Sequence, residues 1–422
     1  MKIQNWKELA TSDLRRTALN LAETALAAID TRPAVRRAVA WEDSNLRIGE
    51  ERLARAALRR IFLVTVGKCA GDAAAALEEI LGDQLAAGIA LDIKPNSSLR
   101  KVNILVGTHP LPSAENVAAA HKILDLLRAA GLQADDLVLV VVSGGGSTLL
   151  CTDRPAEERG LFQNLTRSGA TIQEMNTVRK HLSMLRGGFL AQAAYPAQVR
   201  GLIFSDVPGN DIQFIASGPT VADATTIADA EQVLARYGLP PATGWMETPK
   251  DPKYFQNVRN LTVVSNAVAL QAMAAAAQSA GYAASVVTET LSGEAAAIGR
   301  QVLADLKGRP GRTVLLYGGE TTVTVRGAGR GGRNLEVALA ALPEIGANEL
   351  ILTLATDGHD NGPWSGAICD IITQASANQI HLQPDAFLAG NDSYGFFELV
   401  GNYLVTGPTG ANVSDIIIAL KE

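Results

Sequence analysis

Three consecutive glycines follow the most apolar stretch of the chain, Leu137–Val142, and serines stand on both sides of them. The residues of this segment are Ser143, Gly144, Gly145, Gly146 and Ser147. Glycines allow a backbone to approach a ligand closely, and successive backbone N–H groups can form a nest for an anion. A flexible turn is the alternative, but such a turn rarely follows a buried strand so abruptly. The pattern therefore favours the binding of a phosphate or a carboxylate.

Two cationic side chains stand where they could hold the same kind of ligand. Lys68 follows the apolar run Ile61–Val66 and Gly67, so helix-terminal amides and its ammonium group could attract an anion together. This is not a P-loop, because Phe62 stands where that pattern requires its first glycine. On this observation alone, a surface lysine without a role is an equal alternative. Arg333 lies in a glycine-rich segment, and guanidinium groups bind phosphates and carboxylates in a bidentate manner.

The glycines near Arg333 also match a dinucleotide-binding fingerprint. Gly327, Gly329 and Gly332 satisfy G-x-G-x-x-G, which normally follows a fully buried strand. The preceding segment, Thr321–Val325, alternates threonine and valine, so we predict a strand with one solvated face. Three arginines within eight residues are also more than a pyrophosphate needs. The match gives weak support for a nicotinamide cofactor, and a polyphosphate or a carboxylate is the favoured ligand.

Three carboxylates and one pair of helical residues complete the candidate site. Asp206, Glu320 and Asp357 follow predicted strands, where each could accept a proton, orient a hydroxyl group or hold Mg²⁺. Capping of a turn or a helix is the alternative for the aspartates. Asn176 and Arg179 are three residues apart and share one helix face. From that face they could reach an anionic ligand, or they could simply face solvent.

The elements that position these residues alternate between short apolar runs and longer amphipathic stretches, which is typical of α/β layers. The predicted strands are Ile61–Val66, Val102–Val106, Leu137–Val142, Val199–Phe204, Thr262–Ser265, Ser285–Thr288, Thr313–Tyr317, Thr321–Val325, Leu350–Leu354 and Ile416–Leu420. Helices are predicted at Ala114–Ala130 and Ile172–Leu185, and two more before residue 60. A proline-rich stretch, Pro240–Asp251, marks a boundary, so we predict domains of residues 1–250 and 251–422.

Composition limits the kind of protein further. The chain has 422 residues, with 43 acidic and 37 basic side chains and a net charge of −6, and its basic residues form no cluster. Nucleic acid is therefore not expected as the main partner. Cys69, Cys151 and Cys369 are odd in number and widely spaced, so we expect a reducing cytoplasm and no disulfide framework. Met1–Arg16 is polar and the apolar runs are strand-length, so neither a signal peptide nor a membrane partner is expected.

The chain closely resembles the glycerate 2-kinase family in a series of ordered motifs. These are VGKCAGD, THPLPSAEN, SGGGSTLL, MNTVRKHLSMLRGG, SDVPGNDIQFIASGPTVAD, YGGETTVTVRGAGRGGRNLE, TDGHDNG and TGPTGANVSD. They run from about Val66 to Asp415, and the carboxyl-terminal part corresponds to the family's MOFRL region, about residues 311–418. Many family members carry the name hydroxypyruvate reductase in genomes, which is inherited from operon context.

The resemblance implies two α/β domains. The first is a Rossmann-like parallel sheet with helices on both faces, the second is smaller with a mixed sheet, and the active site lies in the interdomain cleft. It implies transfer of the γ-phosphoryl group of ATP to the 2-hydroxyl of D-glycerate, giving 2-phosphoglycerate and ADP, with Mg²⁺ or another divalent cation. Lys68 and Arg333 match the family's proposed catalytic pair. We expect Asp206 or Asp357 to orient the 2-hydroxyl, and Glu320 or Asp357 to interact with the metal.

The remaining residues expected to bind substrate or ATP surround these positions. They are Ser143, Gly144, Gly145, Gly146, Ser147, Asn176, Arg179, Glu320, Asn334 and Asn412. The chain departs from the family pattern after Asp357, where Asn361 intervenes and a shortened loop, GPWSGA, follows. Asp360 is therefore a weaker candidate than Asp357, and Trp364 is expected to alter the rim of the cleft.

Two other functions are compatible with parts of the sequence. An NAD(P)H-dependent hydroxypyruvate reductase would use the G-x-G-x-x-G match, and a non-catalytic sugar-phosphate-binding protein would use the same nests without chemistry. The number of acids and cations weighs against the second alternative. A monomer and a homodimer are both compatible with the sequence.

Overall fold

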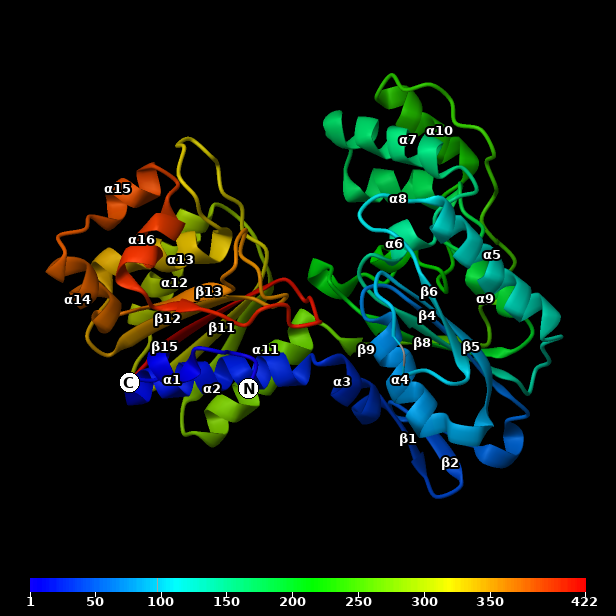
Figure 1. Ribbon diagram of the computed structural model, residues 1–422, viewed down its shortest axis with the longest axis horizontal. Coiled ribbons are helices and arrows are strands. Elements are labelled where there is room, and N and C mark those ends of the chain that lie inside the picture. The colour runs from blue at the N-terminus through cyan, green and yellow to red at the C-terminus, as the bar shows by residue number, and fades with distance from the viewer. Residues whose placement is uncertain (97) are drawn as a thin grey trace. The chain divides into compact units, whose positions relative to one another are not determined.

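The computed structural model describes residues 1–96 and 98–422, which form two compact units (Figure 1). Thr31–Val263 is the parallel-sheet unit, and Met1–Asp30 together with Val264–Glu422 is the mixed-sheet unit. This division differs from the predicted domains 1–250 and 251–422, because the first long helix packs on the carboxyl-terminal half of the chain. The prediction of two α/β domains, one with a parallel and one with a mixed sheet, is confirmed.

The parallel-sheet unit contains six strands in the order β6–β5–β4–β7–β8–β9. In chain order they are β4 (Ile61–Val66), β5 (Leu85–Asp92), β6 (Val102–Val106), β7 (Leu137–Val142), β8 (Gln198–Phe204) and β9 (Val258–Val264). β4 and β7 are buried at every position, as expected of uninterrupted apolar strands that are covered on both faces. The pairs β5–β6, β4–β5, β4–β7 and β7–β8 are parallel.

The strand order of this sheet identifies where a ligand would bind. Numbered from the first strand of the sheet, the order is 3-2-1-4-5-6, which is the Rossmann arrangement. The chain moves outward from β4 in one direction and from β7 in the other, so the crevice at the carboxyl ends of these two strands is the topological switch point. Gly67-Lys68 follows β4, and the triple-glycine segment follows β7.

Helices cover this sheet. α4 (Ala70–Leu81) packs against β4 and β5, while α5 (Ala114–Ala129) and α9 (Phe189–Ala194) contribute to one core with Phe62, Val64 and Val66. α5 confirms the predicted helix Ala114–Ala130. The other small elements are α3 (Thr31–Ala38), β1 (Val39–Glu42), β2 (Asn45–Ile48), β3 (Glu51–Ala54) and α6 (Gly146–Leu149).

A separate helical layer lies in the same unit (Figure 1). α7 (Pro155–Arg167), α8 (Ile172–Lys180) and α10 (Ile227–Arg236) share a small core that includes Phe162, Val178 and Val233. α8 ends at Lys180 rather than at the predicted Leu185. The reason is local: Ser183 Oγ accepts hydrogen bonds from the N–H groups of Leu185 and Arg186, both 3.3 Å away, and so stabilises a turn there.

The mixed-sheet unit has six strands in the order β10–β11–β15–β12–β13–β14. Their bounds are β10 (Ala283–Leu291), β11 (Thr313–Gly319), β12 (Glu349–Ala355), β13 (Gly366–Asp370), β14 (Tyr403–Leu404) and β15 (Asp415–Lys421). β10 and β11 are parallel, and the remaining neighbours are antiparallel. The last strand of the chain therefore begins at the edge of the sheet where β11 and β12 end.

The helices of this unit come from both ends of the chain. They are α1 (Trp6–Leu9), α2 (Asp13–Ala28), α11 (Asn266–Ser279), α12 (Ala295–Lys307), α13 (Arg333–Ala341), α14 (Ile371–Gln379), α15 (Pro384–Ala389) and α16 (Ser393–Val400). α2 packs against α11, β12 and β15, and Arg15 on α2 forms a buried ion pair with Asp370 at 2.6 Å. No helix in the described part of the chain is long and apolar enough to cross a membrane.

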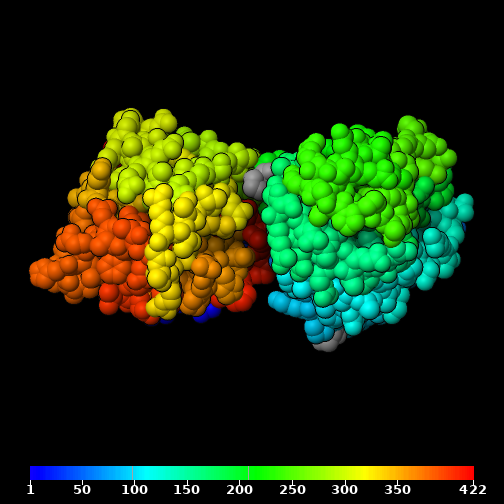
Figure 2. Space-filling view, turned by 90° about the horizontal axis from the view of Figure 1, so that it is seen from above, coloured from blue at the N-terminus to red at the C-terminus, as the bar shows by residue number. Residues whose placement is uncertain are grey.

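The predicted strand Thr321–Val325 is wrong. Only Thr322 forms a bridge, to Glu294, and the segment continues as a loop to Gly332. Asn391 Oδ1 accepts hydrogen bonds from the N–H groups of Arg326 (2.7 Å) and Gly327 (2.9 Å), which ties the loop to the unit without strand pairing. Val325 is 74% exposed, and Figure 2 shows this yellow part of the chain on the surface. The Thr/Val alternation therefore does not mark a strand here.

Candidate active site

Lys68 and the triple-glycine segment meet at the switch point of the parallel sheet. Lys68 N–H donates to the carbonyl of Gly144 at 3.0 Å, and Ser143 N–H donates to the carbonyl of Val66 at 2.9 Å. Gly67 has φ +121°, and a Cβ at this position would overlap Ser143, so only glycine allows the two loops to approach this closely. The predicted proximity of these two loops is therefore present in the structure.

The triple-glycine segment presents backbone donors. Gly145 has φ +84° and precedes the short helix α6, and a Cβ placed on it would lie 3.3 Å from Lys68 Cγ. Within the described residues, the N–H groups of Gly144, Gly145 and Ser147 have no hydrogen-bond acceptor. These backbone donors lie next to the exposed ammonium group of Lys68, an arrangement that suits phosphate oxygens.

Polar side chains from three other segments surround this loop. A Cβ on Gly144 would overlap the carboxylate of Asp206, so that carboxylate lies directly against the glycine backbone. Ser147 Oγ is 2.9 Å from Ser217 Oγ, and Ser217 Oγ donates to Asn176 Oδ1 at 2.5 Å. The structure thus brings Asp206, Ser147 and Asn176 to the same loop, as predicted for a common site.

Ser217 is a site residue that sequence reasoning did not identify. Ala216 and Ser217 have φ values of +49° and +58°, a left-handed conformation that is strained for residues with side chains. Both are buried, and the strain places the Ser217 hydroxyl between Ser147 and Asn176. The only signal in the sequence is the polar turn ASGPT after the SDVPGND motif, which is too short to predict this geometry.

His109 lies beside Lys68. Its Cδ2 atom is 3.2 Å from the position of a Cβ on Gly145. Burial lowers the pKa of His109, and the positive charge of Lys68 lowers that pKa further, so the neutral imidazole is favoured. The histidine therefore adds polarity to the site without adding charge at neutral pH.

The mixed-sheet unit carries the other predicted residues. Arg333 is the first residue of α13, and its guanidinium contacts Glu320 through Nη1 and lies 3.1 Å from Asp415 Oδ2 through Nε. In the sheet, Asp415 is paired in register with Gly319 at the end of β11 and with Ala355 at the end of β12. Glu320, Asp357 and Asp415 therefore occur at one edge of this sheet.

Asp415 is the second site residue that sequence reasoning missed. Burial raises its pKa to about 7, against the opposing effect of the Arg333 charge, and nearby Asp360 and Glu320 raise it further. A carboxyl group with this pKa changes its charge under physiological conditions. The motif TGPTGANVSD ends with this residue, but nothing in its spacing predicts contact with Arg333.

Asp360, Asp357 and the two asparagines have more local roles. Asp360 is buried and accepts hydrogen bonds from the N–H groups of Asn334 (3.0 Å) and Leu335 (2.8 Å), so it caps α13 and fixes the position of Arg333. Asp357 is half-buried, and its Oδ1 accepts a hydrogen bond from His359 N–H at 3.0 Å. Asn412 Oδ1 accepts a hydrogen bond from Ser414 N–H at 2.9 Å.

A cavity of about 700 Å³ adjoins Arg333 within the mixed-sheet unit. Its lining includes the charged residues Arg330, Glu336 and Asp360 beside apolar groups such as Val323 and Tyr394. Trp364, which the sequence suggests at a cleft rim, is only 8% exposed and its ring is stacked on Tyr394 and Tyr403 at centroid distances of 4.0 and 3.7 Å. The expectation that Trp364 alters a rim is wrong, because its ring is part of the aromatic core.

The G-x-G-x-x-G match has a structural explanation other than dinucleotide binding. A Cβ on Gly327 or Gly329 would overlap the backbone at Gly390, and a Cβ on Gly332 would overlap Asp360. The glycines thus allow the exposed loop to pack against α15 and the cap of α13. The buried strand β11 ends at Gly319 and a loop separates it from these glycines, so the dinucleotide arrangement of strand, turn and helix is absent from this described segment.

Fold and site together define a two-domain α/β protein with anion-binding groups on both units. Lys68, Asp206 and the glycine loop belong to the parallel-sheet unit, whereas Arg333, Glu320 and Asp357 belong to the mixed-sheet unit. The family described as a domain of unknown function, DUF4147, matches residues 17–246, and the MOFRL family matches residues 313–415. The chain belongs to the glycerate 2-kinase family, which combines these two regions.

Relatives and a solved structure agree with this assignment. A protein from Agrobacterium vitis with a provisional hydroxypyruvate reductase name is 40% identical over 85% of this chain and 86% of its own length. The glycerate 2-kinase of Pyrococcus horikoshii is 34% identical over 97% of both chains. The crystal structure of glycerate kinase from Thermotoga maritima has a TM-score of 0.87 and 32% identity, and covers 96% of this chain and 99% of that chain.

Proposed function

We propose that this chain is an ATP-dependent glycerate 2-kinase. It transfers the γ-phosphoryl group of ATP to the 2-hydroxyl of D-glycerate and releases 2-phosphoglycerate and ADP. The observation that carries this proposal is the position of Lys68 and a glycine nest at the switch point of a Rossmann-ordered sheet, in a chain that belongs to the glycerate kinases. We also propose that the protein acts in the cytoplasm, where small-molecule substrates of this kind are used.

Phosphoryl transfer needs positioned cations and little covalent chemistry from the protein. In the parallel-sheet unit, the Lys68 ammonium group and the free N–H groups of Gly144, Gly145 and Ser147 would bind phosphoryl oxygens. Asp206 lies against Gly144 and is the nearest carboxylate to this nest, so it is the stronger of the two candidates for orienting the 2-hydroxyl and accepting its proton. Asp357 remains the alternative.

Arg333 is the cation of the mixed-sheet unit that would bind and neutralise an anionic group of the substrates. Glu320 and Asp415 contact its guanidinium from two sides, and Asp360 holds the helix end on which it lies. These contacts fix the direction of the guanidinium before substrate binds, which lowers the cost of ordering it in the transition state. We propose that Arg333, like Lys68, binds an anionic group of the substrates during turnover.

The carboxylates at the edge of the mixed sheet fit a divalent cation. Asp415 Oδ2 is buried and lies 3.1 Å from Arg333 Nε without accepting a hydrogen bond, and Glu320 and Asp357 follow strands that end at the same edge. Among the described residues, no three metal-binding side chains are grouped, so a cation would need additional ligands. Mg²⁺ meets this condition, because it binds one or two carboxylates and completes its shell with water and phosphate oxygens. The chemistry it supplies when bound is neutralisation of phosphate charge.

The proposal is tested by incubating the protein with D-glycerate, ATP and Mg²⁺ and observing the products by phosphorus NMR. A 2-phospho product and ADP are expected, and a 3-phospho product would contradict the proposed regiochemistry. Hydroxypyruvate and NADH are supplied in a parallel reaction, because one relative carries the reductase name. Oxidation of NADH without phosphoryl transfer would contradict the kinase assignment and support the reductase assignment.

A further inference from the structure

Arg179 does not lie in the glycine nest but lines a separate cavity of about 310 Å³ in the parallel-sheet unit. One face of α7 forms much of the cavity, and the segment 110–112 and Thr148 of α6 complete it. Thr148 follows the glycine loop directly, so the cavity adjoins the nest by way of α6. The predicted ligand contact of Arg179 would therefore take place in this second space.

Arg179 forms no ion pair with the carboxylates that the structure describes. Its guanidinium stacks on the ring of Phe162 at 4.3 Å from the centroid, and no carboxylate of the described residues forms an ion pair with it. Burial lowers the pKa of Arg179 to about 10, and the charge of buried Arg186 lowers that pKa further, against the opposing attraction of Glu158. The group is still charged at neutral pH, so the protein bears the desolvation cost of a cation that no ion pair among the described residues offsets.

The carboxylate in the cavity wall is already neutralised. Glu158 is 4% exposed, accepts a hydrogen bond from Arg186 Nη2 at 2.7 Å and accepts another from Thr152 N–H at 2.9 Å. Arg186 itself does not line the cavity. The lining therefore presents three arginines, Arg159, Arg167 and Arg179, against one carboxylate that is paired from outside.

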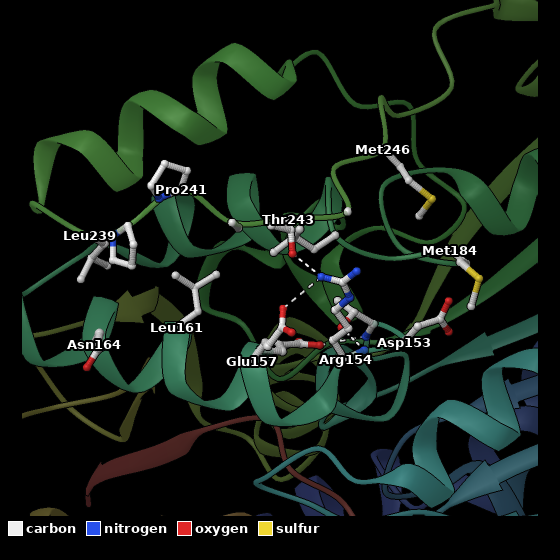
Figure 3. A pocket seen from close by; sticks show the side chains of 16 residues that line it. Asp153, Arg154, Glu157, Leu161, Asn164, Met184, Leu239, Pro241, Thr243 and Met246 are labelled. Atoms are coloured by element: carbon white, nitrogen blue, oxygen red, sulfur yellow. Dashed lines mark hydrogen bonds and ion pairs between the residues drawn. The ribbon is translucent and has the colours of Figure 1, made fainter.

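A neighbouring cavity shows the contrast. It has a volume of about 620 Å³ and shares Glu158 with the first, but Arg154 in it donates to Glu157 at 3.4 Å and contacts Thr243 (Figure 3). Leucines, prolines and methionines form most of the remaining wall. The charge of Arg154 is thus paired with a carboxylate of the protein, whereas Arg179 forms no ion pair among the described residues.

We propose that the cavity around Arg179 is a second anion-binding site, which takes a phosphate-bearing small molecule. Its volume is sufficient for a phosphate group with a short carbon chain, and is at the lower limit for small-molecule sites. The stacked guanidinium offers its edge for bidentate binding, and Arg159 and Arg167 add charge at the exposed rim. The phosphate can belong to ATP or to a free phosphorylated acid, and binding of either rests on the proposed kinase function.

Binding of inorganic phosphate to the full chain tests the site independently of catalysis. The Lys68→Ala variant serves as the background, because it weakens the glycine nest. Calorimetry is expected to detect phosphate binding to Lys68→Ala and a loss of at least about tenfold in affinity when Arg179→Gln is added, since a bidentate ion pair is removed. Arg154→Gln, in the neighbouring cavity, is the matched control and should leave phosphate affinity unchanged. Equal affinity with and without Arg179→Gln would overturn the proposal.

Kinetics of the otherwise native enzyme distinguish the two sources of phosphate. If ATP supplies it, Arg179→Gln raises KM for ATP about tenfold and leaves KM for D-glycerate unchanged. If a phosphorylated acid supplies it, both KM values stay constant and inhibition by added 2-phosphoglycerate weakens. If the kinetics of Arg179→Gln match those of the control Arg154→Gln in every respect, including inhibition by 2-phosphoglycerate, the proposed site is contradicted. An inactive wild-type enzyme whose phosphate binding depends on Arg179 would contradict the kinase and leave the site supported.

A second variant, at the rim of the cavity, tests the site even if Arg179→Gln does not fold. Arg167 is exposed on α7 and lines the same cavity, so Arg167→Gln should fold normally. Its expected effect is a two- to threefold loss of phosphate affinity, which disappears at high salt because the interaction is screened. Unchanged affinity at low salt in Arg167→Gln, together with normal affinity in a folded Arg179→Lys variant, would count against recognition by the guanidinium groups.

Discussion

Lys68 and Arg333 are the two proposed catalytic cations, yet the protein holds them differently. Lys68 is exposed, and no carboxylate of the described residues pairs with its ammonium group, so its charge is available to a ligand. Arg333 is half-buried between Glu320 and Asp415, so part of its charge is already compensated. A mobile point charge suits a phosphoryl group that moves, while a fixed planar group suits a ligand whose orientation must be set.

Replacing Lys68 by alanine should abolish most turnover without affecting the fold. Loss of one preorganised cation at the transferred group is expected to lower kcat by about 10²- to 10³-fold. The thermal midpoint should stay within a degree or so, since the side chain makes no ion pair. Lys122→Ala, on the exposed face of α5, is the matched control and should retain wild-type kinetics. More than a tenth of the wild-type kcat in Lys68→Ala would contradict the role.

Asp415 makes stability depend on pH. Its pKa of about 7 in the folded protein lies above the ordinary value, so between pH 4 and 7 the folded state binds the proton more tightly than the unfolded chain. This contribution favours folding at low pH and is lost as the pH rises through 7. Asp415→Asn cannot titrate, so its free energy of unfolding relative to wild type should increase with pH by at most about 1.4 kcal/mol per unit.

The measurement is denaturant unfolding of both proteins from pH 5 to pH 8, with EDTA present so that no metal competes for the carboxylate. A difference between the two free energies that is constant over this range would show that Asp415 does not titrate there. A difference that falls with pH would contradict the raised pKa as well, because a carboxyl group with an ordinary or lowered pKa is ionised in both states throughout this range. The Lys68→Ala variant, measured in parallel, should follow the pH dependence of wild type.

At the scale of elements, the loop between β4 and α4 depends on one glycine. Gly67 combines φ +121° with close packing against Ser143, so Gly67→Ala should strain the loop by roughly 1–3 kcal/mol and displace Lys68. Both the free energy of unfolding and kcat should fall. Gly160→Ala is the control, because Gly160 lies inside α7 with no atom near a new Cβ and should gain about 0.5–1 kcal/mol. A wild-type kcat in Gly67→Ala would show that catalysis does not depend on this loop geometry.

Elements buried on both faces were predictable from sequence, and elements anchored by single side chains were not. β4 and β7 are continuous apolar runs, so pattern and burial agree. The loop after β11 has an alternating pattern but is held by hydrogen bonds to Asn391, a residue far along the chain. Asp415 was missed for the same reason: register in the sheet, not spacing in the sequence, brings it to Arg333.

At the scale of the whole chain, the amino-terminal residues are part of the mixed-sheet unit. Lys2 N–H and Ile3 N–H donate to the Glu23 carboxylate at 2.9 and 2.6 Å, and Gln4 N–H donates to the carbonyl of Val405 at 2.7 Å. The predicted domain boundary near residue 250 did not assign the amino-terminal residues to the carboxyl-terminal unit, because contact between the two ends of a chain leaves no local pattern in the sequence. A chain cut at that boundary would separate α2 from the sheet on which it packs.

The buried pair between Arg15 and Asp370 is therefore expected to control the stability of one unit only. Arg15 Nε and Nη2 donate to the two oxygens of Asp370 at 2.6 and 2.7 Å, and the same carboxylate caps α14 through Thr373 N–H. Arg15→Ala leaves a buried carboxylate unpaired, which costs about 3–5 kcal/mol. Arg16→Ala, one residue away, removes only an exposed pair with Asp13 and should cost less than about 0.5 kcal/mol.

Native-state hydrogen exchange distinguishes the units in this experiment. In Arg15→Ala, amide protection in β12 and β15 should fall by a factor that corresponds to the lost free energy, while protection in β4 and β7 should stay at the wild-type level. Equal loss of protection in all four strands would mean that the two units unfold as one, and unchanged protection in β12 would mean that the pair is not stabilising. If the expected pattern is found, residues 1–30 stabilise the sheet that carries Arg333, and shortened variants of the enzyme must keep them.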